Sequence, residues 1–208
     1  MHHRDAFNAL IDTMKVAVAE LREADVQFML GGSMAAWARG GPEPDKDLDL
    51  MVKPDQAEAA LEALARAGMR VERPPEEWLL KAWHGEVLID LIFHPSGLEL
   101  TDEVFERAET IAVMSLGTPV MALEDALVTM LYALDEHTLD YSRLLAISRA
   151  LREQIDWPSL RARASSSPYA KAFLTLVEEL GIAPGDAPSM PGEGGGAPNR
   201  VRVVGGAE

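Results

Sequence analysis

The chain has 208 residues, 48% of them hydrophobic and 25% charged, a balance typical of one globular domain with room for a small annex. It contains no cysteine, which excludes disulfide bonds and thiolate metal sites. The net charge is −15 and the acidic excess falls almost wholly within residues 1–142, which disfavours a large nucleic-acid footprint because such a footprint must neutralise phosphates.

The chain shows neither the apolar stretch of a signal peptide at its N-terminus nor an apolar run of about 18 residues, the length that spans a membrane. We therefore expect a cytoplasmic protein with no membrane partner.

Hydrophobic spacing predicts an α/β fold, with a short mixed β-sheet flanked by helices. Helices are expected at 5–23, 33–38, 55–67 and 101–108. Strands are expected at 26–30, 47–52, 69–71, 111–114 and 119–121, and a hairpin around Gly85 from 78–83 and 87–93.

Four helical segments follow, at 123–135, 139–152, 157–164 and 168–180. After Gly181 the composition shifts to proline, glycine, alanine and serine, which cannot build a core. We expect a core at 1–122, a C-terminal helical annex at 123–181 and a disordered tail at 182–208.

Gly31, Gly32 and Ser33 stand between a predicted strand and a predicted helix. Glycines let backbone amides converge at such a turn, and amides at the start of a helix bind phosphate. A tight turn that binds no ligand would have the same composition.

Asp47 and Asp49 lie in the alternating segment DLDLMV, so both side chains project from one face of a strand. Their Cα atoms should lie about 7 Å apart, a spacing at which two carboxylates can share one or two Mg²⁺ ions. An exposed strand face with solvated acids is the alternative.

Asp90 interrupts the apolar run VLIDLIF. A carboxylate in a central strand costs several kcal/mol unless it is paired or bound to metal. Asp90 therefore needs a partner, and no lysine or arginine adjacent in sequence supplies it. An edge strand with Asp90 facing water is the alternative.

Together, the stretches GGSMAAWARG, DKDLDLMV and VLIDLIF resemble the signature of the DNA-polymerase-β-like nucleotidyltransferases. The resemblance covers roughly residues 26–135. It is strongest with small bacterial members, namely uncharacterised nucleotidyltransferases, the abortive-infection toxin type and the minimal antitoxin type.

The resemblance implies that Gly31, Gly32 and Ser33 bind the triphosphate of a nucleotide such as ATP, with Lys46 near a phosphate. It implies that Asp47 and Asp49 coordinate Mg²⁺, with two ions possible. Asp90 would bind metal as well or help to deprotonate the attacking hydroxyl. The implied reaction moves a nucleoside monophosphate from a nucleoside triphosphate to a hydroxyl of a small molecule, a protein or RNA.

One departure from the family concerns a lysine that related members often carry on the helix matching 123–135. Met130 takes that position here. Either Lys81, Arg39 or Lys46 replaces the lysine in space, or the triphosphate is held loosely, or catalysis has been lost. The last option leads to an alternative function, a non-catalytic partner protein in a toxin–antitoxin-type system. A toxin that modifies tRNA is disfavoured by the acidic charge.

Overall fold

The computed structural model describes residues 3–44 and 46–185. Within them, seven strands form one mixed sheet in the order β3-β4-β5-β2-β1-β7-β6. The strands are β1 (Phe28–Leu30), β2 (Asp47–Val52), β3 (Arg70–Glu72), β4 (Leu79–His84), β5 (Val87–Ile92), β6 (Glu109–Val113) and β7 (Leu116–Val120). The β1–β7 and β2–β5 pairs are parallel and the other pairs are antiparallel.

In the described part of the chain, the first four helices alternate with the strands, and the last four follow the final strand. They are α1 (His3–Glu23), α2 (Gly32–Trp37), α3 (Ala57–Arg66, after a 3-10 turn at Pro54–Gln56), α4 (Asp102–Glu106), α5 (Leu123–Tyr132), α6 (Ser142–Leu151), α7 (Trp157–Arg163) and α8 (Pro168–Glu179). The α/β fold with a short mixed sheet and flanking helices, expected from the sequence, is confirmed.

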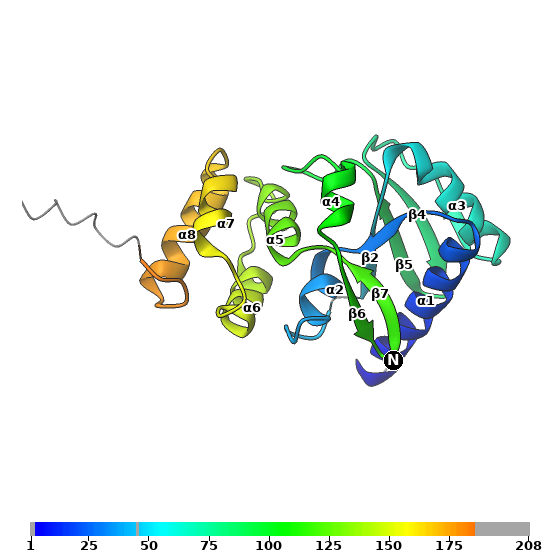
Figure 1. The fold of residues 1–208 in the computed structure, drawn as a ribbon, viewed down its shortest axis with the longest axis horizontal. Coiled ribbons are helices and arrows are strands. Elements are labelled where there is room, and N and C mark those ends of the chain that lie inside the picture. The colour runs from blue at the N-terminus through cyan, green and yellow to red at the C-terminus, as the bar shows by residue number, and fades with distance from the viewer. Residues whose placement is uncertain (1–2, 45, 186–208) are drawn as a thin grey trace, which may run out of the picture.

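The two faces of the sheet differ in what covers them. Helices α1 and α3 pack together against β2, β4 and β5, and Figure 1 shows them on one side of the sheet with α2, α4 and α5 on the other. Burial alternates along the central strands, as the two-residue period of a strand requires. Leu48, Leu50, Ile89 and Leu91 are fully buried in the main core, whereas the acidic residues between them are only partly buried.

A second hydrophobic cluster joins α5 to α6, α7 and α8, which extend away from the sheet in Figure 1. Ala36 of α2 also belongs to this cluster, so α2 lies between the sheet and the helical annex. The segment predicted to be a disordered tail lies outside the described residues from position 186 onward. At its start, Ile182 and Ala183 are buried in the second cluster.

Polar contacts also tie the annex to the sheet. The carboxylate of Asp125, in the first turn of α5, is fully buried and accepts hydrogen bonds from Arg107, after α4, and Arg163, at the end of α7. Arg143 donates to the Glu43 carbonyl over 2.6 Å, and Gln154 donates to the Arg39 carbonyl over 3.1 Å. The last two contacts hold the loop that leads from α2 into β2.

None of the described helices combines the length and apolar character needed to cross a bilayer.

Candidate active site

Three neighbouring strands bring Asp49, Asp90 and Lys81 into one row across the sheet. Asp49 on β2 is the register partner of Asp90 on β5, and Asp90 is the register partner of Lys81 on β4. Directly paired residues project from the same face, and neighbouring strands lie about 4.8 Å apart. We call this side of the sheet, which also bears Asp47, the carboxylate face.

Asp47 lies two residues before Asp49 and is paired in register with Leu88. Both aspartates are partly buried, and the residues that alternate with them are fully buried. The structure therefore brings Asp90 to the same face of two parallel strands as Asp47 and Asp49, although Asp90 is far from them in sequence. This arrangement contradicts the alternative of an edge strand for Asp90, since β5 lies between β2 and β4.

Asp90 has a cationic neighbour that the sequence interpretation missed. Lys81 donates from Nζ to Oδ1 of Asp90 over 3.1 Å, and the two side chains are 25% and 14% exposed. Asp90 was expected to need a partner that no residue adjacent in sequence supplies, and Lys81 is adjacent to it across the hairpin. The two-residue turn at Gly85 and Glu86 sets the register that pairs position 81 with position 90 and was the signal that could have revealed it.

The glycine turn packs directly against the second aspartate. The amide of Gly31 donates to the Asp49 carbonyl over 2.9 Å. Gly32 has a φ of +48°, and a Cβ placed on it would lie 1.8 Å from Oδ2 of Asp49. Only glycine fits here, and its missing side chain leaves the space that the Asp49 carboxylate occupies.

Two further predicted nucleotide contacts border this turn. Ser33 follows Gly32 in α2 and is buried. Lys46 precedes Asp47 at the start of β2 and is exposed. The sites predicted at Gly31, Gly32, Ser33 and Lys46 thus lie at the same edge of the sheet as Asp47, because the end of antiparallel β1 meets the beginning of β2 there.

The carboxylate face has the ligand chemistry of a Mg²⁺ site, since carboxylate oxygens are the hard donors that this ion prefers. The missing side chain of Gly32 lets the Asp49 carboxylate lie directly against the turn. In the part of the chain that the structure describes, however, no three acidic or histidine side chains already converge as metal ligands. One oxygen of the Asp90 carboxylate is engaged by Lys81.

The residues considered as substitutes for the family's lysine differ in their surroundings. Met130 packs against the second hydrophobic cluster. The Arg39 side chain is 6% exposed and pairs with Glu109 over 3.0 Å. Lys81 is the basic side chain that directly contacts one of the three aspartates through a described ion pair.

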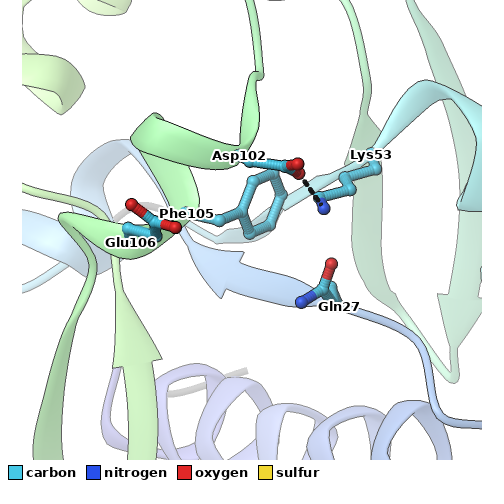
Figure 2. A pocket seen from close by; sticks show the side chains of 5 residues that line it. All are labelled: Gln27, Lys53, Asp102, Phe105 and Glu106. Carbon is cyan, nitrogen blue, oxygen red and sulfur yellow. Dashed lines mark hydrogen bonds and ion pairs between the residues drawn. The ribbon is translucent and has the colours of Figure 1, made fainter.

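A separate pocket of about 310 Å³ opens at the opposite edge of the sheet. It is lined by Gln27, Lys53, Asp102, Phe105 and Glu106 (Figure 2). Lys53 forms an ion pair with Asp102, as the dashed line in Figure 2 marks, and lies 5.5 Å from the centre of the Phe105 ring. Lys53 follows Asp49 by four residues, so its Cα lies about 13 Å from that of Asp49 along the strand.

A mixed sheet with Asp-x-Asp on one strand, a single aspartate in register on the next and a glycine turn beside them defines a protein of the nucleotidyltransferase fold. The chain belongs to a family of uncharacterised nucleotidyltransferases, whose model matches residues 42–178. The match includes Asp47, Asp49, Lys81 and Asp90, and it begins after the glycine turn.

Solved structures resemble the chain in fold at low sequence identity. The crystal structure of ANT(2")-Ia in complex with adenylyl-2"-tobramycin has a TM-score of 0.59 and 15% identity, and the alignment covers 80% of this chain and 97% of that chain. The solution structure of the antibiotic-resistance factor ANT(2")-Ia has a TM-score of 0.57 and 15% identity, over 81% of this chain and 92% of that chain. No curated protein sequence matches the chain.

Proposed function

We propose that the protein transfers a nucleoside monophosphate from a nucleoside triphosphate to a hydroxyl group of an acceptor and releases pyrophosphate, with a divalent cation bound by Asp47 and Asp49. The observation that carries this proposal is the register of Asp49 with Asp90 on neighbouring parallel strands of a family member. The reaction needs positioning and charge neutralisation more than covalent chemistry, and an arrangement of acids beside a glycine turn suits it.

Each group has a distinct role in this proposal. Gly31, whose amide donates to the Asp49 carbonyl, shapes the turn. The Gly32 amide and the amide and hydroxyl of Ser33 bind the triphosphate, with Lys46 at its exposed side. Mg²⁺ held by Asp47 and Asp49 neutralises phosphate charge during transfer. Asp90 completes the site and accepts the proton of the attacking hydroxyl or joins the metal ligands.

The acceptor proposed first is a hydroxylated small molecule. This proposal is supported by the similar fold of ANT(2")-Ia, which was solved in complex with adenylyl-2"-tobramycin, an adenylylated small molecule. The adenylyl group in that complex also makes ATP the first donor to test. The acidic chain disfavours RNA as an acceptor.

The decisive experiment is titration calorimetry of the protein with ATP, GTP, CTP or UTP in the presence of Mg²⁺. We expect Asp47→Ala/Asp49→Ala to lose binding of the preferred nucleotide by at least about tenfold, since the metal loses its ligands. Equal binding by the parent and the double variant would refute the site. Transfer of label from the preferred nucleotide to molecules of the host lysate, with Asp90→Asn as the inactive control, would then identify the acceptor.

The alternative is a non-catalytic partner of a toxin–antitoxin-type system, and the observation that favours it is the apolar packing of Met130 at the position of the family's lysine. In that case nucleotide transfer is absent and a small partner protein co-purifies from the native host. Recovery of the protein alone, together with label transfer, would exclude this alternative.

A further inference from the structure

The Asp90 carboxylate forms an ion pair with Lys81. The contact is direct, at 3.1 Å, and it lies within the sheet because Lys81 and Asp90 are paired in register on β4 and β5. The Asp90 side chain is only 14% exposed, so water screens this pair less than it would screen a pair on the surface.

A divalent cation bound between Asp49 and Asp90 would approach the Asp90 carboxylate, whose Oδ1 Lys81 engages. The two aspartates are register partners on neighbouring strands, so their carboxylates lie close together on the same face of the sheet. An ammonium and a divalent cation cannot both lie beside the Asp90 carboxylate without strong repulsion at short range.

We propose that Lys81 is a built-in counter-ion that competes with the divalent cation for Asp90. In the metal-free protein Lys81 neutralises Asp90 and stabilises the strand pair. When a divalent cation binds with the nucleotide, it displaces the ammonium from the carboxylate. The protein therefore has a weak site for free divalent cations and reaches full affinity only with the nucleotide present. This inference rests on the proposed function, because it assumes that the aspartates bind metal.

The test compares Mn²⁺ binding without nucleotide, followed by electron paramagnetic resonance, in the parent and in Lys81→Met. Methionine keeps an unbranched apolar stem as long as that of lysine up to Cε and removes the ammonium group. We expect Lys81→Met to bind Mn²⁺ about three- to tenfold more tightly than the parent, because a competing cation is gone. A purely structural role for Lys81 predicts the opposite, since loss of a stabilising contact would loosen the site.

The chain offers a matched control in Lys53→Met. Lys53 also pairs with a carboxylate, that of Asp102, but at the far edge of the sheet (Figure 2). This variant should bind Mn²⁺ as the parent does. Lys81→Arg keeps the charge and should also retain the affinity of the parent.

Thermal unfolding gives a second readout. In EDTA, Lys81→Met should melt below the parent because Asp90 has no counter-ion, and added Mn²⁺ should raise its melting temperature more than that of the parent. If Lys81→Met does not fold, Lys81→Gln serves the same comparison. Unchanged or weaker Mn²⁺ affinity in the neutral variant would overturn the proposal.

The two proposals fail separately. If Asp47→Ala/Asp49→Ala binds nucleotide as well as the parent does, the proposed function fails. If that double variant loses nucleotide binding while Lys81→Met binds Mn²⁺ no more tightly than the parent, only the competition by Lys81 is refuted.

Discussion

Gly32 and Asp49 constrain each other more tightly than any other pair of predicted site residues. The glycine backbone takes a left-handed conformation, and the Asp49 carboxylate fills the space where a side chain would be. The position of this carboxylate therefore depends on a residue that contributes no side-chain chemistry of its own.

Gly32→Ala should disable the site while leaving the fold. The left-handed backbone costs an alanine about 1–2 kcal/mol, and the new Cβ must also push Asp49 aside. Gly68→Ala is the matched control, because Gly68 has a φ of +84° with no atom within 4 Å of the added Cβ. Calorimetry with nucleotide and Mg²⁺ should show a loss of at least about tenfold for Gly32→Ala only. Similar binding by both variants would argue against a functional role for the contact.

For individual residues, the sequence predicted that Asp47 and Asp49 share a face, but it did not reveal the ion pair of Lys81 with Asp90. Strand alternation was enough to place Asp47 and Asp49 on one face, because that period is local. The position of Asp90 beside Asp49 depends on how two distant strands pair, which no local pattern contains. The Lys81 partner was within reach of prediction through the length of the hairpin turn.

Among the elements, the loop between α5 and α6 is stabilised by hydrogen bonds to the carboxylate of Asp135. Asp135 accepts hydrogen bonds from the amides of His137 and Thr138, over 2.7 and 2.8 Å. The amide of His137, followed by the hydroxyl and amide of Thr138, lowers the pKa of Asp135 below its ordinary value of 3.8. The ionised carboxylate therefore stabilises the folded loop.

Because the folded pKa is depressed, this support is fully present above pH 3.8 and is lost as the pH falls through the lower, folded value. We expect the amide protons of His137 and Thr138 to lose their protection from exchange with solvent in that acidic range. NMR exchange measurements on the parent check this, with Asp135→Ala as a variant that lacks the protection at every pH. Protection that stays constant into strong acid would contradict the assignment.

The helices and strands themselves were largely predictable. Each observed helix from α1 to α8 overlaps a segment with helical spacing, and the hairpin of β4 and β5 surrounds Gly85 as expected. The strand order was not predictable, because it joins β2 to β5 and β1 to β7 across long stretches of chain. The spacing of apolar residues indicates which face of a helix or strand is buried, but it does not indicate which neighbouring element covers that face.

For the molecule as a whole, Asp125 is the polar link between sheet and annex. It is fully buried, whereas the Arg107 and Arg163 side chains that bind it are 49% and 31% exposed. No sequence pattern pointed to this cluster, since its three members come from three separate segments. Removing the cations should therefore harm the protein more than removing the anion, because only the anion lacks contact with water.

We expect Arg107→Met/Arg163→Met to lose about 3–5 kcal/mol of unfolding free energy, since it leaves a buried carboxylate without a counter-ion. Asp125→Asn should lose less, because its two arginines remain hydrated. Urea unfolding of the three proteins at neutral pH gives the comparison. A larger loss for Asp125→Asn than for the double variant would show that the arginines, not the carboxylate, are the costly groups.

The row of Lys81, Asp90 and Asp49 has a consequence for how the chain finds its fold. A shift of β4 by one residue would turn Lys81 inward, under α1 and α3, and a shift of β5 would do the same to Asp90. Incorrect strand pairing would therefore bury a charge in the apolar core, so these residues of the proposed site also favour the correct register. Correct alignment of the central strands during folding therefore also assembles the proposed site on the carboxylate face.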